Sequence, residues 1–148
     1  MFKHILVATD GSALSLKAAK TAVRLAASLG SRLTGVYVIP KYMPLIYGEA
    51  VMYLPEMSPI TFKKAAGKEA DAALAVMTKL AAAAGITCVS LKVTNAHPWS
   101  AIISVARGKK CDLIVMASHG RGGLAGFLLG SETTKVLTHS KVPVLVCR

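Results

Sequence analysis

The residues best suited to chemistry lie in a glycine-rich stretch of the C-terminal third. It runs MASHGRGG from Met116 and later GSETT from Gly130, where a helix is expected to begin. Glycines let the backbone approach a ligand closely, and the free N–H groups at a helix start can bind phosphate oxygens. Ser131 and Thr133 add hydroxyl donors, and His119 and Arg121 can add charge. The stretch predicts a phosphate-binding loop.

Asp10 is the second candidate. It ends the apolar run FKHILVAT near the N-terminus, where its carboxylate can accept a hydrogen bond from a ribose or a base. Structural roles are alternatives: Ser12 or Asp10 can cap the first helix, Ser131 can cap the last one, and His119 can bond to backbone. The residues alone leave these alternatives open.

Strands and helices must alternate to position these residues. Helical spacing or a helix start signal is found at residues 14–30, 61–85, 98–110 and from Ser131. Short β-rich apolar runs occupy residues 2–9, 31–40, 86–93, 111–118 and 142–147. Helical crossovers make neighbouring strands parallel, so we predict a Rossmann-like α/β fold with helices on both faces of an open parallel sheet. Ligands of such sheets bind at the carboxyl ends of the strands, which brings the loops after the first and fourth strands together.

The connection from Lys41 to Pro59 has three prolines, three tyrosines and no sustained period. We expect an irregular excursion, which either covers a site or partner surface or is merely exposed.

Composition narrows the class of protein. A chain of 148 residues with 53% hydrophobic content predicts one domain, residues 1–148, without a membrane span. Cys88, Cys111 and Cys147 are expected to be buried reduced thiols, which together with the lack of a signal peptide favours a cytoplasmic location. The net charge of +11 is spread along the chain, so we expect a solvated basic surface and no nucleic-acid partner. No P-loop, zinc-protease or nucleophile-elbow motif is present, and the histidines lack metal-ligand spacing.

The whole chain resembles the universal stress protein family. Its nucleotide-binding members carry Gly-x-x-Gly, nine residues, then Gly-Ser or Gly-Thr; here the stretch runs from Ala117 to Gly120, then RGGLAGFLL, then Gly130 and Ser131. ILVATDGS, VYVI, CDLIVMASHGRGG, LLGSETTKVLTHS and VPVLVCR extend the resemblance. Ala117 replaces the first glycine, and its methyl group would crowd a sugar if the backbone needed glycine-like dihedrals. The carboxylate of Glu132 would repel a phosphate unless it turns away.

The resemblance implies a five-stranded sheet of order 3-2-1-4-5 and a bound adenine nucleotide, ATP or AMP, with Mg²⁺ as a further candidate. It implies that Ala8, Thr9 and Asp10 border the adenosine and that the Val38 backbone reads the adenine edge. The remaining expected site residues surround the ribose and phosphates: Met116, Ala117, His119, Gly120, Arg121, Gly130, Ser131, Glu132 and Thr133.

A regulatory protein of the stress response is the function that the resemblance favours. A slow ATPase and a dimeric interaction module with an empty site are alternatives. The chain has seven acidic residues, of which Asp10 and Glu132 alone are expected near the pocket, so binding is favoured over catalysis. A homodimer is expected through the apolar edge strand from Val142 to Cys147.

Overall fold

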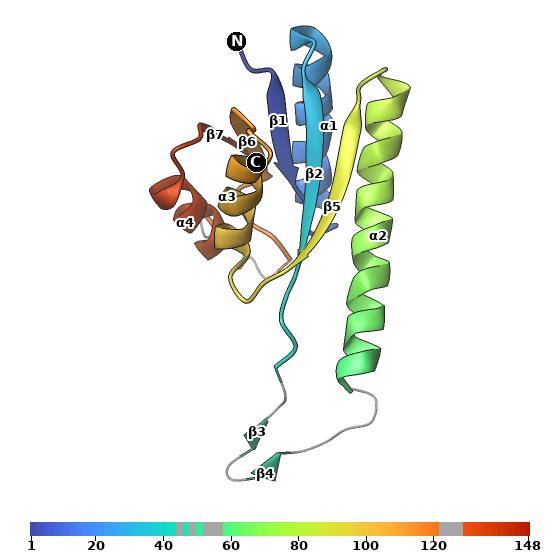
Figure 1. Cartoon of the computed structure of the whole chain (residues 1–148), viewed down its shortest axis with the longest axis vertical. Coiled ribbons are helices and arrows are strands. Elements are labelled where there is room, and N and C mark those ends of the chain that lie inside the picture. Colours follow the sequence, from blue (N-terminus) through green and yellow to red (C-terminus); the bar gives the residue numbers. More distant parts are fainter. Residues whose placement is uncertain (44–45, 48–49, 52–57, 122–128) are drawn as a thin grey trace.

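The elements of this computed structural model alternate as expected (Figure 1). The structure describes residues 1–43, 46–47, 50–51, 58–121 and 129–148. In chain order the elements are β1 (His4–Ala8), α1 (Ala13–Leu29), β2 (Arg32–Ile39), β3 (Ile46–Tyr47), β4 (Ala50–Val51), α2 (Pro59–Ala83), β5 (Cys88–Thr94), α3 (Pro98–Gly108), β6 (Leu113–Ala117), α4 (Ser131–His139) and β7 (Val144–Cys147).

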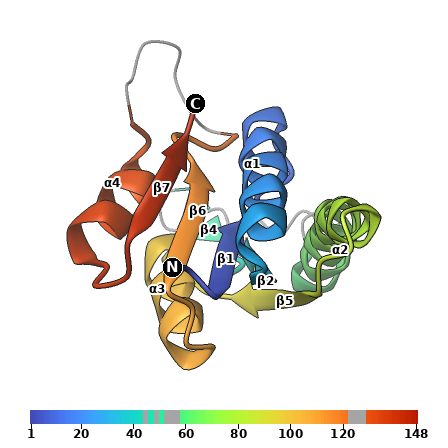
Figure 2. The ribbon, with the colours of Figure 1, turned by 90° about the horizontal axis from the view of Figure 1, so that it is seen from above.

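Five of the strands form one parallel sheet in the order β5-β2-β1-β6-β7. Numbered among themselves, these strands have the order 3-2-1-4-5, which confirms the predicted fold. Helices α1 and α2 cover one face, and α3 and α4 cover the other (Figures 1 and 2). All five residues of β6 are buried because this strand is central and covered on both faces.

Local signals fix the helix ends. The Ser12 side chain accepts a hydrogen bond from the Ser15 N–H at 3.1 Å, so Ser12 and not Asp10 is the N-cap of α1. Gly30 ends the same helix with a φ of +66°, a conformation that favours glycine. Pro98 occupies the first turn of α3, as predicted.

The segment after β2, predicted to be irregular, contains two short strands. β3 and β4 pair antiparallel beyond the end of the main sheet (Figure 1). Each strand has two residues, which is too short for an alternating pattern to be recognised in the sequence. Residues 44–45, 48–49 and 52–57 of this segment, and residues 122–128 of the predicted glycine-rich loop, lie outside the described residues.

The predicted burial of the three cysteines is confirmed only for Cys111. Cys111 is buried, but Cys88 and Cys147 are partly exposed because β5 and β7 are the two edges of the sheet. All three thiols are free. Burial raises the pKa of Cys111 to about 11, so this thiol is protonated at neutral pH.

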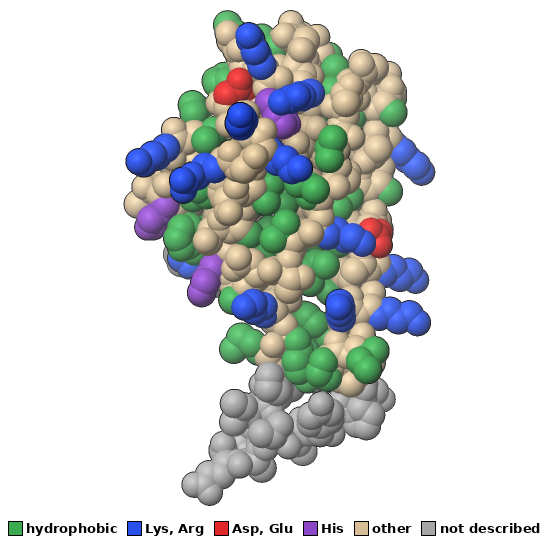
Figure 3. Space-filling model, in the orientation of Figure 1, with side chains coloured by type: hydrophobic (Ala, Val, Ile, Leu, Met, Phe, Trp, Pro, Cys, Tyr) green, Lys and Arg blue, Asp and Glu red, His purple; other side chains and the backbone are tan. Residues whose placement is uncertain are grey.

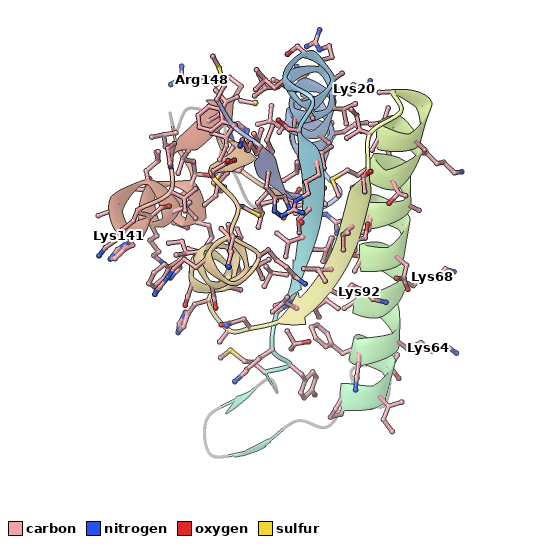
Figure 4. The ribbon with its side chains drawn as sticks, turned by 45° about the horizontal axis from the view of Figure 1, so that its top comes forward. Lys20, Lys64, Lys68, Lys92, Lys141 and Arg148 are labelled. Carbon is pink, nitrogen blue, oxygen red and sulfur yellow. The ribbon has the colours of Figure 1, made fainter. Side chains whose placement is uncertain are left out.

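Basic side chains are distributed around the molecule. In Figure 3, Lys and Arg are scattered among hydrophobic side chains on the visible face. The six cations labelled in Figure 4 come from α1, α2, β5, the turn before β7 and the C-terminus. Within the described part of the chain, none of the helices combines the length and hydropathy that a membrane span requires.

Gly35 in the middle of β2 leaves space that a side chain of α2 fills. A Cβ at this position would collide with the thioether end of the fully buried Met77. Gly67 of α2, in contrast, has open space where a Cβ would lie, with no atom within 4 Å, and its φ is not positive. Replacing each glycine by alanine therefore tests a different effect. At Gly35 the added methyl group disturbs packing, and at Gly67 it improves helix propensity.

We expect Gly35→Ala to lower the free energy of unfolding by about 1–3 kcal/mol, since Met77 must leave its rotamer. Gly67→Ala should raise it by roughly 0.5–1 kcal/mol because alanine is the better helix former. Urea denaturation of both variants measures the difference. Equal stability of Gly35→Ala and wild type would contradict the packing argument.

His4 is buried at the opposite end of the sheet from the predicted site. Its Nε2 lies 2.7 Å from Thr34 Oγ1, and its Nδ1 is the one buried side-chain nitrogen or oxygen without a partner among the described residues. Burial, with a smaller effect of Arg32, lowers the pKa of His4 despite the nearby carboxylate of Asp112. The folded protein therefore resists protonation at this position.

This pKa shift predicts a loss of stability on acidification. Above about pH 6.5 both states hold a neutral His4; below it the unfolded chain takes up the proton first, and stability falls by up to about 1.4 kcal/mol per pH unit. In His4→Gln, stability should depend less on pH between pH 7 and 5. Parallel denaturation curves at the two pH values provide the measurement, and identical pH dependence of the two proteins would exclude His4 as the cause.

Candidate functional site

One pocket of about 360 Å³ opens at the carboxyl edge of the sheet, between β1 and β6. The strand order reverses at this point, which is where open α/β sheets bind ligands. All thirteen site residues expected from the sequence line it: Ala8, Thr9, Asp10, Val38, Met116, Ala117, His119, Gly120, Arg121, Gly130, Ser131, Glu132 and Thr133.

The start of α4 presents its first backbone N–H groups to this pocket. Gly130 is the N-cap and supplies no side-chain bond, so Ser131 is the first helical residue and does not cap the helix as the sequence allowed. The first N–H groups of a helix have no acceptor within it. Ser131, Glu132 and Thr133 thus present the N–H groups and the positive end of the helix dipole that favour an anion.

Thr133 has a structural role that the sequence did not reveal. Its hydroxyl, expected as a free donor to phosphate, donates to the Ala117 carbonyl at 3.0 Å in a buried bond. The Gly130 N–H donates to the Ser118 carbonyl at 2.8 Å. These two bonds fasten the first turn of α4 to the end of β6.

The carboxylate of Glu132 turns toward α3. One oxygen accepts from the Trp99 N–H at 2.8 Å and the other lies 3.3 Å from Lys135 Nζ. His97 at the N-cap of α3 makes no side-chain capping bond, so Glu132 provides the cap from another helix. The repulsion foreseen between this carboxylate and a phosphate is reduced accordingly.

Asp10 joins the two turns that border the pocket. Its Oδ1 accepts from the Ser12 N–H at 3.0 Å, and its Oδ2 accepts from the Arg121 N–H at 2.9 Å. A Cβ on Gly120 would lie 2.5 Å from Oδ2, which explains why a glycine precedes Arg121. Burial opposes ionisation, but the hydrogen bonds outweigh it and lower the pKa of Asp10, which therefore stays charged at neutral pH.

Val38 and Ala117 border the pocket near the ends of β2 and β6. Ala117 is the last residue of β6 and has no positive φ, so its methyl group costs no backbone strain there. The Val36 carbonyl accepts from the Thr9 N–H and the Ile39 carbonyl from the Asn95 N–H. Residues of a parallel strand bond alternately to its two neighbours, so the Val38 backbone points to the side of β1, which ends at Ala8. Among the described residues beyond Ala8, none forms a backbone hydrogen bond to the N–H or C=O of Val38 from that side.

The ring of His119 lies next to Ser118, whose Oγ is 3.1 Å from Nδ1, so its side-chain partner is not the backbone. Among the described residues, His, Cys, Asp and Glu side chains do not gather in groups of three that would hold a metal ion.

Four further lining residues were not predicted: Ser15, Val36, Pro98 and Ile102. Val36 precedes Val38 by two positions and therefore shares its face of β2, a signal present in the sequence. Pro98 and Ile102 belong to the helix that follows β5, whose carboxyl end lies at the same edge of the sheet. Ser15, in the first turn of α1, bonds to Thr9 Oγ1 at 3.0 Å, a contact that only the structure reveals.

Comparison with known proteins identifies the family. The model of the universal stress protein family matches residues 1–148. A universal stress protein of Thermus aquaticus is 32% identical over the full length of both chains. One of Methanocaldococcus jannaschii is 32% identical and covers all of this chain and 83% of the relative. A solved universal stress protein in complex with cAMP is 28% identical, with a TM-score of 0.71 and coverage of 99% of this chain and 97% of the other. The chain therefore belongs to the universal stress protein family.

Proposed function

We propose that the pocket between β1 and β6 binds an adenine nucleotide, ATP or AMP. The observation that carries this proposal is the convergence of the N-terminus of α4, the Asp10 carboxylate and the Val38 backbone on one pocket. The complex of a relative with cAMP supports an adenine nucleotide as the ligand class.

Each half of the nucleotide would have its own partners. Val38 would bond to the adenine edge, and Asp10 would accept from a ribose hydroxyl through the lone pairs left free on its oxygens. Ala8, Thr9, Met116 and Ala117 would enclose the sugar and base. The phosphates would bind the N–H groups of Ser131 to Thr133 with Gly120 and Gly130 beside them, and His119 and Arg121 would supply charge.

The hydrogen bonds at the pocket favour binding over hydrolysis. A general base that works near neutral pH needs a pKa close to that pH, whereas hydrogen bonds lower the pKa of Asp10. Asp10 and Glu132 already accept from backbone N–H groups on other elements, which fixes their orientation. Mg²⁺, where it accompanies the ligand, would be held mainly by phosphate oxygens and water.

We further propose that this single-domain protein acts in the cytoplasm as a regulator of the stress response, as its family suggests. The nucleotide would be a signal, stabilising the conformation that it binds best.

The nucleotide proposal predicts binding of adenosine, AMP and ATP to the wild type by calorimetry. Asp10→Asn should weaken all three about tenfold or more, since a charge-assisted hydrogen bond to the ribose is lost. Asp112→Asn is the matched control: Asp112 also accepts two backbone N–H bonds, from Lys3 and His4, but at the opposite end of the sheet. No heat with any of the three compounds at millimolar concentration would refute the proposal.

We also propose a homodimer through residues 142–147. β7 is an edge strand with an open side, and Leu145 is 37% exposed. Sedimentation should give twice the mass of the chain for the wild type and the mass of one chain for Leu145→Lys. Val89→Lys, at an exposed position of the other edge strand β5, should remain dimeric. A monomeric wild type would exclude this interface.

A further inference from the structure

Arg121 lines the pocket, but its guanidinium is bound to a residue outside it. Its Nη1 lies 2.7 Å from Oε2 of Glu69, which is on α2. Its backbone N–H donates a hydrogen bond to Oδ2 of Asp10. A Cβ on Gly11 would lie 2.9 Å from its Nη2, so the guanidinium rests against the turn between β1 and α1. Arg121 thus connects the pocket with α2.

Arg121 is also the charge that a phosphate would need. Among the described residues that line the pocket, it is the one Lys or Arg side chain. The hydrogen bond to Glu69 raises the pKa of Arg121 further, so the guanidinium is charged at every physiological pH. Phosphate and carboxylate bind guanidinium through the same N–H fork.

Glu69 lies at the boundary between an unburied and a buried part of α2. The buried side chains of α2 are Ala70, Leu74, Met77 and Ala81, all of them after Glu69. The first ten residues of the helix, 59–68, have no fully buried side chain. The pair between Glu69 and Arg121 therefore lies where the packed part of α2 begins.

We propose that Glu69 competes with the nucleotide phosphate for Arg121, so that a phosphate in the pocket releases the start of α2. This inference rests on the proposed function and adds a device that regulates the same site. It distinguishes ligands by charge: adenosine leaves the pair intact, whereas AMP and ATP break it. Both side chains are about half exposed, at 51% and 54%, so the pair is weak enough to be exchanged.

Calorimetry with adenosine and AMP on Glu69→Gln tests the competition. AMP should bind about two- to fivefold more tightly than to the wild type, the range expected from an exposed ion pair, and adenosine should bind equally well. Asp71→Asn is the matched control, because Asp71 carries the same charge on the same helix but pairs with Lys92 at 2.6 Å. It should leave the ratio of the AMP and adenosine affinities unchanged.

A double-mutant cycle separates the pair from a general effect of charge. In an Arg121→Gln background, Glu69→Gln should no longer change the AMP affinity. Hydrogen exchange of residues 59–68 should increase with AMP and stay constant with adenosine. An unchanged ratio of AMP to adenosine affinity in Glu69→Gln would overturn the competition. Failure of the wild type to bind any of adenosine, AMP and ATP would instead refute the proposed function.

Discussion

The structure depends on the parallel pairing of β1 with β6. These two strands are neighbours in the sheet, yet the chain leaves them toward opposite faces, into α1 from β1 and toward α4 from β6. The helices that follow them therefore separate above the strand ends. This separation leaves the space that forms the pocket. The hydrogen bond from the Arg121 N–H to Asp10 spans this gap, so one carboxylate holds together two turns that are far apart in the sequence.

Sequence reasoning recovered the sheet because its signals are local. Five short apolar runs and helices bounded by Ser12, Gly30 and Pro98 determine the alternation, and the alternation determines the parallel pairing. β3 and β4 were missed since two residues cannot show a period. The glycine-rich stretch and the rule for strand ends predicted Asp10 and the residues from Met116 to Thr133, whereas Ala8, Thr9 and Val38 came from the resemblance to the family. The hydrogen-bond partners of the pocket side chains were not predicted. The bonds from Thr133 to Ala117 and from Trp99 to Glu132 join separate elements, and the sequence does not show which elements are in contact.

Each side-chain carboxylate in the described part of the chain has a defined hydrogen-bond donor. The five acidic residues that the structure describes all accept a hydrogen bond from another element or turn: Asp10, Glu69, Asp71, Asp112 and Glu132. At the pocket, Glu132 caps α3 and Asp10 joins two turns. Asp112 accepts a hydrogen bond at the start of β1. Since 18 Lys and Arg residues face only seven acidic ones in the sequence, most positive charges have no acidic counterpart, and the protein keeps a strongly positive potential.

The extension of β2 beyond the end of β1 has an evolutionary consequence. The hydrogen-bonding groups that Val38 exposes belong to the main chain, so every non-proline residue at this position would present the same pair of donor and acceptor. Substitutions here alter the shape of the pocket wall but not its hydrogen-bonding pattern. Evolution must instead preserve the length by which β2 extends beyond β1. That length can be kept after most of the sequence identity has been lost.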